Sequence, residues 1–151
     1  TLNMLTIEHN LKNILEMGTQ YGQSTISLLL AAKEIGGHVT SIDIDSCLEA
    51  KKTVKQYNLE DYWTFIQGDD TKVEWDNSID HLFIDSLHTY DHVMKQLNKY
   101  EPFVKKGGVI TMHDIVHDPP VLKAIEDYFK NRDVKIYKYF NSMGFAVILK
   151  K

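Results

Sequence analysis

The chain has 151 residues, of which 43% are hydrophobic and 25% charged, and its formal net charge is −4. This size and composition suit one globular domain and exclude a disordered, collagen-like or low-complexity chain. The excess of acidic over basic residues argues against nucleic-acid binding. The sequence contains no apolar run of about 18 residues, so no membrane span is predicted. The single cysteine, Cys47, cannot form an internal disulfide, so a reducing, cytoplasmic location is expected.

Along the first half of the chain, short apolar runs that suit strands alternate with longer runs of helical period. Gly36 and Gly37 are typical helix terminators, and Asp45 or Ser46 can cap the helix that follows. The expected elements are a short helix near 7–11, a strand at 13–18, a helix at 24–35, a strand at 38–44, a helix from 45 or 46 to about 57, and a strand at 63–67.

The second half continues this alternation and then breaks it. Gly107 and Gly108 are expected to end a helix, and Asp118 followed by Pro119 and Pro120 is a typical helix start. The expected elements are a strand at 79–84, a helix at 90–104, a strand at 109–112, a helix from 118 to about 131, and strands at 134–140 and 143–150. The connection near Asn141 is too short for a parallel crossover, so the last two strands should pair antiparallel.

These elements predict an α/β fold of three layers over a single domain, 1–151. Helices should cover both faces of a mostly parallel seven-stranded sheet whose last strand is antiparallel. A dinucleotide-binding oxidoreductase would normally continue with parallel strands, so the final hairpin argues against that class. Few residues precede the first strand, so an N-terminal lid over the site is expected to be short or missing.

Ligands of open parallel sheets bind at the carboxyl ends of the strands. After the first strand, Gly18 and Gly22 form a loop that either lets a ligand approach backbone N–H groups or is a plain turn into the next helix. After the second strand, Asp43 either accepts hydrogen bonds from ribose hydroxyls or, like Asp45, caps the following helix.

The third strand ends in Gly68, Asp69 and Asp70. A carboxylate there could accept a hydrogen bond from an adenine amino group, and a solvated turn is the simpler alternative. Outside these strand ends, His9 and His92 look like surface residues. Cys47 is expected in the first turn of a helix, where its pKa could be lowered, and its role is interpreted as packing.

The fourth and fifth strands end in Asp85, His88, His113 and Asp114. Adjacent strands lie about 5 Å apart, so these carboxylates and imidazoles could converge. Such a group could hold a divalent cation and provide a base for a hydroxyl proton. The alternatives are a helix-capping or loop role for His88 and a hydrogen-bonded strand-end role for His113.

Together these motifs resemble the class I S-adenosylmethionine-dependent methyltransferases, whose fold is Rossmann-like. The resemblance covers residues 13–150 and rests on Glu16-x-Gly18-x-x-x-Gly22, Ile42-Asp43, Gly68-Asp69 and the terminal hairpin. The segments 83–91 and 107–114 are more specific and resemble small-molecule O-methyltransferases, with relatives that act on macrolide sugars or are of the metal-dependent catechol type.

The resemblance implies S-adenosylmethionine as cofactor, with Mg²⁺ or another divalent cation as a second candidate. It implies that His88 is the general base, with Asp85 beside it in catalysis. The metal ligands would be Asp85, His113 and Asp114, although an imidazole at position 113 suits Mg²⁺ poorly. The residues expected to bind the cofactor are Glu16, Gly18, Thr19, Tyr21, Gly22, Ser24, Asp43, Ile44, Gly68, Asp69, Asp70 and Asp85.

The sequence therefore predicts an O-methyltransferase that acts on a hydroxylated small molecule or a sugar, with no nucleic-acid or membrane partner. A homo-oligomer is compatible with this prediction. The main alternative is a non-catalytic module that binds S-adenosylmethionine or a nucleoside and regulates a partner. A nucleic-acid methyltransferase is disfavoured by the acidic balance and by the absence of an Asn-Pro-Pro-Tyr-like motif.

Overall fold

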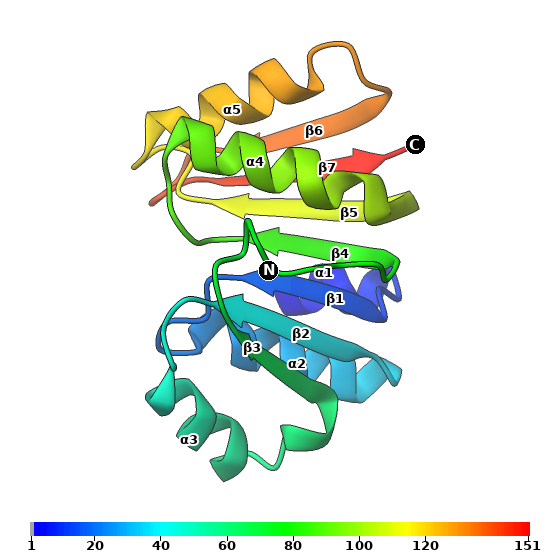
Figure 1. The fold of residues 1–151 in the computed structure, drawn as a ribbon. Coiled ribbons are helices and arrows are strands. Elements are labelled where there is room, and N and C mark those ends of the chain that lie inside the picture. Colours follow the sequence, from blue (N-terminus) through cyan, green and yellow to red (C-terminus); the bar gives the residue numbers. More distant parts are fainter. Residues whose placement is uncertain (1) are drawn as a thin grey trace.

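The computed structural model describes residues 2–151 (Figure 1). Helices and strands alternate along the chain until the final hairpin. The helices are α1 (Leu2–Glu8), α2 (Gln23–Ile35), α3 (Leu48–Gln56), α4 (Tyr90–Tyr100) and α5 (Pro119–Phe129), with short 3₁₀ turns at Glu60–Tyr62 and Glu101–Phe103. The strands are β1 (Asn13–Met17), β2 (His38–Asp43), β3 (Trp63–Gln67), β4 (Ile79–Ile84), β5 (Val104–His113), β6 (Val134–Tyr139) and β7 (Phe145–Lys150).

The strands form one seven-stranded sheet in the order β3-β2-β1-β4-β5-β7-β6. Strands β1 to β5 pair in parallel, and β7 runs antiparallel to both of its neighbours. The predicted fold class, with its reversed last strand, is confirmed. The strand order reverses direction between β1 and β4, which is where an open α/β sheet offers a crevice to a ligand.

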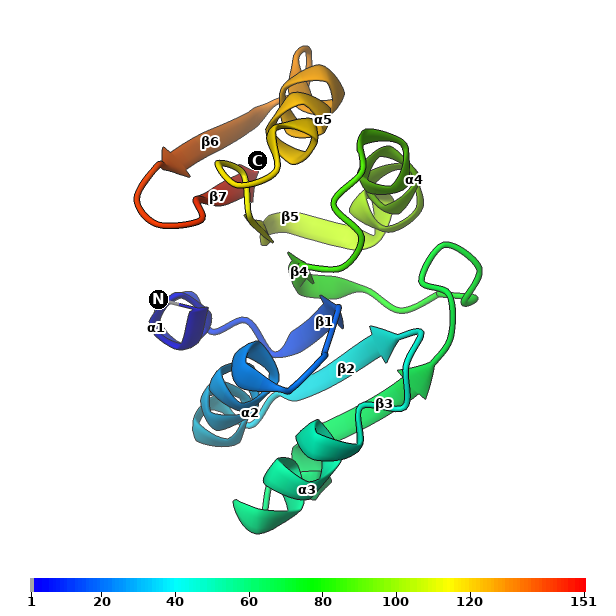
Figure 2. The same cartoon turned by 90° about the vertical axis from the view of Figure 1, so that its left-hand side faces the viewer.

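Helices cover both faces of the sheet, as the end-on view in Figure 2 shows. Side chains of β1 alternate between the two faces, as the pleat of a strand requires. Leu15 and Met17 pack in the core under α4 and α5, whereas Ile14 packs against α2. No helix within residues 2–151 is long and apolar enough to cross a membrane.

Two helix boundaries differ from the predictions at the start of their elements. The first helix lies at Leu2–Glu8 and not near 7–11. Helix α3 begins at Leu48, after Cys47 in a left-handed conformation, and no side chain caps it. The predicted caps Asp45 and Ser46 are therefore wrong.

The segment around Gly107 and Gly108 also differs from the prediction. Helix α4 ends at Tyr100, and the two glycines lie inside β5. Gly107 has φ +80°, and the pairing of β4 with β5 shifts register between Ile79 and His81. A bulge in a strand and the end of a helix both use glycine at positive φ, so the pair of glycines alone could not distinguish them.

A buried polar chain ties α1 to the middle of the sheet. His81 of β4 is fully buried, and its Nδ1 and Nε2 lie 3.1 Å from Thr6 Oγ1 and 2.8 Å from Thr111 Oγ1. Thr6 Oγ1 donates its own proton to the carbonyl of Leu2. His81 must therefore donate from Nδ1 to Thr6 and accept at Nε2 from Thr111, so the chain of hydrogen bonds fixes one neutral tautomer.

Candidate active site

A cavity of about 1590 Å³ opens at the carboxyl end of the parallel strands. The loops after β1, β2, β3, β4 and β5 line it, together with the connection between β6 and β7. Figure 2 looks onto this end of the sheet. Of the residues predicted to bind the cofactor, all line the cavity except Glu16 and Gly22.

The two glycines of the first loop are required by the packing of the chain itself. Gly18 has φ +91°, and a Cβ atom there would lie 2.0 Å from the carbonyl oxygen of Asp85. Gly22 has φ +86°, and a Cβ atom there would lie 2.8 Å from the Cβ of Ala50. The loop after β1 therefore lies directly against the end of β4, and Gly18 forms part of the cavity wall.

Glu16 lies behind this loop, fully buried. Its Oε2 accepts hydrogen bonds from Thr25 Oγ1 at 2.7 Å and from Ser41 Oγ at 2.6 Å. Its Oε1 is buried and has no hydrogen-bond partner among the described residues. Burial raises the pKa of Glu16 to about 7, against the pull of those hydroxyl donors.

Asp43 holds the first loop in place from the end of β2. Its Oδ2 accepts from the backbone N–H groups of Thr19 at 2.7 Å and Gln20 at 3.0 Å, and its Oδ1 accepts from Asp45 N–H at 2.9 Å. Partial burial would raise the pKa of Asp43, but these hydrogen bonds outweigh it and lower the pKa below its usual value. Asp43 therefore does not cap α3, and it is a fixed negative charge in the cavity wall.

The neighbouring carboxylates Asp69 and Asp70 differ in their surroundings. Asp69 Oδ1 accepts from Thr71, and Lys72 Nζ lies 3.0 Å from its Oδ2, so the pKa of Asp69 is held far below its usual value. Asp70 is buried and accepts from Ser86 and Gln96. Its Oδ1 lies 2.9 Å from His92 Nε2.

His92 and Leu87 both line the cavity and were missed by the sequence reasoning. The prediction of a surface position for His92 is wrong, since its side chain is only 18% exposed. Leu87 is 57% exposed and Ile44 is 70% exposed, so two large apolar side chains face this space from the ends of β4 and β2.

Cys47 is buried, as a packing role requires. Its pKa is raised to about 12, because burial and the nearby Asp43 carboxylate both disfavour the thiolate. The expectation of a lowered pKa at a helix N-terminus is therefore wrong.

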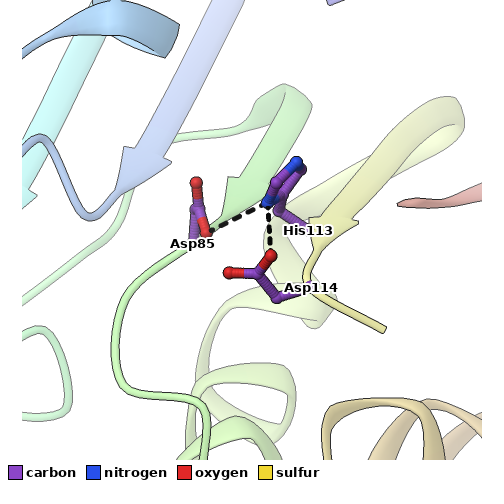
Figure 3. A group of neighbouring side chains, drawn as sticks. All are labelled: Asp85, His113 and Asp114. Carbon is purple, nitrogen blue, oxygen red and sulfur yellow. Dashed lines mark ion pairs between the residues drawn. The ribbon is translucent and has the colours of Figure 1, made fainter. Parts of the chain in front are cut away.

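Asp85, His113 and Asp114 meet where β4 and β5 end (Figure 3). His113 Nδ1 lies 3.9 Å from Asp85 Oδ1 and 2.9 Å from Asp114 Oδ1. Asp114 has φ +60°, and its Oδ1 is buried without a hydrogen bond of good geometry. All three donor atoms lie within 4.8 Å of one another, a spacing that one cation could bridge. Two carboxylates and one imidazole suit Mn²⁺, Fe²⁺ or Zn²⁺ better than Mg²⁺.

His88 lies beside this group, between carboxylates on both sides of its ring. Its Nε2 hydrogen-bonds Asp85 Oδ1 at 3.3 Å, and its Nδ1 lies 3.0 Å from Asp118 Oδ2 and 3.5 Å from Asp114 Oδ2. The hydrogen bond to Asp85 raises the pKa of His88, against partial burial, and Asp114 and Asp118 add to this rise. The structure thus brings together His88, Asp85, His113 and Asp114, as the strand ends predicted.

The connection between β6 and β7 completes the cavity with an apolar wall. Tyr139, Met143 and Phe145 line it, together with Leu2 of α1. Tyr139 and Met143 are exposed. Sequence reasoning missed this wall, because alternating strands do not show which end of a hairpin faces a ligand.

Comparisons with known proteins place the chain among methyltransferases of this fold. The family model described as "Methyltransferase domain" matches residues 15–115. A putative caffeoyl-CoA O-methyltransferase from Staphylococcus aureus has a TM-score of 0.85 and 22% identity, over 99% of this chain and 81% of that chain. The O-methyltransferase from Bacillus cereus, in complex with S-adenosylhomocysteine, has a TM-score of 0.80 and 21% identity, over 99% of this chain and 79% of that chain.

The O-methyltransferase TomG from Streptomyces achromogenes, involved in tomaymycin synthesis and solved with S-adenosylmethionine, is also similar. It has a TM-score of 0.80 and 17% identity, over 99% of this chain and 78% of that chain. At such identities the likeness establishes a shared fold.

Proposed function

This chain belongs to the methyltransferase-domain family, and on that premise we propose that it transfers the methyl group of S-adenosylmethionine to a hydroxyl oxygen. The acceptor is a hydroxylated small molecule or a sugar, and a divalent cation assists the reaction. One observation carries this proposal. A single cavity contains both a wall suited to a nucleoside-bearing cofactor and a cluster of imidazoles and carboxylates suited to a hydroxyl group.

The cofactor wall consists of the loops after β1, β2 and β3. Asp43 is ionised, and its Oδ1, which accepts one backbone N–H, retains capacity to accept a further hydrogen bond from a ribose hydroxyl. Ile44 and Leu87 offer exposed apolar surface for an aromatic base. Glu16 lies behind the loop after β1 and has one buried oxygen without a partner among the described residues. Glu16 therefore supports this loop, and the loop would transmit any interaction with the amino group of the cofactor.

When bound, S-adenosylmethionine supplies an electrophilic methyl group on a cationic sulfur, and it leaves as the neutral thioether. The imidazole of His88 accepts the proton of the acceptor hydroxyl, and the electron pair of that oxygen then bonds to the methyl carbon. The cavity wall orients the two reacting groups and excludes water between them, and such positioning accounts for much of the rate gain in reactions of this kind.

Asp85, His113 and Asp114 would hold the divalent cation. Their donor atoms converge, and the buried Oδ1 of Asp114, which accepts no hydrogen bond of good geometry, is the clearest sign that a positive group belongs there. The chemistry that a cation supplies is to lower the pKa of a coordinated hydroxyl.

Titration calorimetry with S-adenosylmethionine and with its demethylated product tests the proposal, in the presence of Mg²⁺, Mn²⁺ or EDTA. We expect binding in the micromolar range, and tighter acceptor binding with the preferred cation. The variant Asp43→Ala should weaken cofactor binding roughly 10–100-fold, because a charged hydrogen-bond acceptor is lost. The matched control is Asp133→Ala, which removes an exposed carboxylate paired only with Lys151.

Methyl transfer to a panel of catechols, phenols, sugars and aliphatic alcohols then identifies the acceptor. Transfer to at least one hydroxyl compound supports the proposal. Cofactor binding with no transfer across the panel would instead favour the non-catalytic binding module. No binding of either cofactor form would contradict both functions.

A further inference from the structure

We infer that His92 of α4 is a specificity-determining residue for the nucleobase of the cofactor, and that Asp70 is the positioning residue that holds its ring at the cavity wall. This inference rests on the proposed function and deepens it, because it assigns recognition of the purine edge to a side chain outside the strand-end motifs. It also gives Asp70 a different role from the direct contact with an adenine amino group that the sequence suggested.

Asp70 lies in the loop after β3, and other side chains already surround its carboxylate. The residue is 7% exposed. Its Oδ2 accepts hydrogen bonds from Ser86 Oγ at 2.9 Å and from Gln96 Nε2 at 2.8 Å. Its Oδ1 is buried and lies 2.9 Å from His92 Nε2. The carboxylate of Asp70 therefore faces α4 and the loop after β4, and it offers a ligand little surface of its own.

His92 has the exposed surface that Asp70 lacks. Its side chain is 18% exposed and lines the cavity. Because Nε2 is buried on the side of Asp70, the exposed part of the ring lies among its other atoms, which include Nδ1. The protein thus holds the imidazole at one edge and leaves another edge open, as expected of a side chain that recognises a ligand.

The polar group around His92 is also incompletely satisfied. Three of its atoms, His92 Nε2, Asp70 Oδ1 and Gln96 Oε1, are buried without a hydrogen bond of good geometry among residues 2–151. Buried polar atoms in native proteins nearly always have such a partner. Around His81, by contrast, each ring nitrogen has one. The wall at His92 is therefore one that a polar ligand would complete.

Helix α4 also anchors the backbone of the loop after β3. Tyr100 Oη donates to the carbonyl of Asp70, and Lys99 Nζ donates to the carbonyl of Thr71 at 3.0 Å. Figure 2 shows this loop between β3 and α4. The position of Asp70 beside His92 is thus fixed by contacts that need no ligand.

The cavity lining leads from the ribose side to His92. Asp43 is placed to hold the ribose, and Ile44 and Leu87 offer exposed apolar surface for the base. The lining continues to His92 in the first turn of α4. The edge of adenine that carries the 6-amino group and N1 is remote from the ribose, and its polar atoms need partners when they lose water. An imidazole nitrogen can pair with either of them.

Titration calorimetry with S-adenosylhomocysteine and with S-inosylhomocysteine, in which hypoxanthine replaces adenine, tests the inference without any acceptor. The native chain should bind the adenosyl form roughly 10-fold or more tightly, because hypoxanthine reverses the donor and acceptor at positions 6 and 1. His92→Phe keeps a ring without polar atoms and should reduce this preference to about 3-fold or less. His92→Gln keeps a polar group and should retain part of the preference.

Two matched controls separate the base from the rest of the ligand. Asp43→Ala should weaken both ligands by the same factor, since the ribose is common to both. His9→Phe replaces an exposed histidine outside the cavity lining and should alter neither affinity. Thermal unfolding without ligand shows that each variant is folded.

Asp70→Asn, alone and combined with His92→Phe, tests the positioning role. The single variant should lower the base preference roughly 3-fold, because the ring loses the charge beside it. In the combined variant it should cause no further loss, since the two residues act through one contact. Asp91→Asn, at an exposed position of the same helix, controls for loss of charge alone. A purely structural role of Asp70 would weaken both ligands equally.

The outcomes separate this inference from the proposed function. Equal weakening of both ligands by His92→Phe, or no change in either, overturns the role of His92. A loss of preference on Asp70→Asn that persists beside His92→Phe overturns the positioning role, since Asp70 then contacts the base itself. No binding of either ligand by the folded native chain overturns both proposals. Binding without methyl transfer to any acceptor contradicts only the proposed catalysis, and the base preference then still decides the role of His92.

Discussion

His81 lies within β4 and His88 lies in the loop that follows β4. The two histidines differ in how completely the hydrogen-bonding groups around them are satisfied. Around His81, each hydroxyl and each ring nitrogen has a partner, and the whole group is buried. Around His88, carboxylates outnumber donors, and a buried oxygen of Asp114 has no hydrogen bond of good geometry. A closed polar network stabilises a fold, whereas an open one faces a ligand that would complete it.

The largest expected effect comes from the open polar network around His88. His88→Gln should lower kcat by about 10²–10⁴-fold, because the hydroxyl proton loses its acceptor. The free energy of unfolding should change little, since glutamine keeps a side-chain N–H donor for the surrounding carboxylates. Steady-state kinetics and urea denaturation of the same preparations measure both quantities. Full activity in this variant would remove His88 as the base.

The closed polar network around His81 should show the opposite result, a loss of stability with little change in kcat. His81→Ala leaves the buried Thr111 hydroxyl without a partner, removes one of the two partners of Thr6, and opens a cavity, so the free energy of unfolding should fall by about 3 kcal/mol. Folded protein at low temperature should retain its kcat, because His81 is remote from the cavity lining. Thr111→Val, which loses only one hydrogen bond, should cost less, about 1–2 kcal/mol. Equal losses of kcat and stability in His81→Ala would erase the contrast between the clusters.

Glu16 sharpens the comparison, because it is a buried carboxyl with one satisfied and one unsatisfied oxygen. Its pKa is about 7 in the folded chain against 4.5 ordinarily. Between these values the folded chain binds more protons than the unfolded chain, so its stability falls as pH rises through the window. By pH 8 the resulting loss in the free energy of unfolding amounts to about 3 kcal/mol.

The measurement is the difference in unfolding free energy between the native chain and Glu16→Gln at several pH values. That difference should change across pH 5–8 and be flat below and above. The difference is needed because His81 also makes the stability of the chain depend on pH. Burial lowers the pKa of His81 to about 3, so the free energy of unfolding falls as the pH falls below 6.5. Glu34→Gln, at an exposed position with no ion pair among residues 2–151, controls for loss of charge alone. A constant difference would contradict the raised pKa.

The smallest expected effect concerns the apolar surface beside the open cluster. Leu87→Ala should weaken cofactor binding about 5-fold, from the contact area lost. Stability should hardly change, since Leu87 is already 57% exposed. Leu48→Ala, at a similarly exposed residue outside the cavity lining, should alter neither quantity. Calorimetry of the two variants decides whether Leu87 faces the cofactor.

Much of this molecule could be predicted from the sequence because its signals are local. Short apolar runs placed the strands, the short connection near Asn141 fixed the last pairing, and the strand ends brought Asp85 and Asp114 together. The errors arose where one local signal has two meanings. Gly107 marks a bulge in place of a helix end, and Asp45 and Ser46 precede α3 without capping it. Exposure of Leu87 and burial of His92 depend on tertiary packing, which no local pattern contains.

The contact of Gly18 with the backbone of Asp85 also constrains how such a chain can evolve. No larger residue fits at position 18 unless β1 and β4 separate, so change at this wall requires change in the sheet itself. The wall formed by Tyr139 and Met143 carries no such restriction, because exposed side chains there can be exchanged without moving a strand. Substitution is thus restricted on one side of the cavity and tolerated on the other.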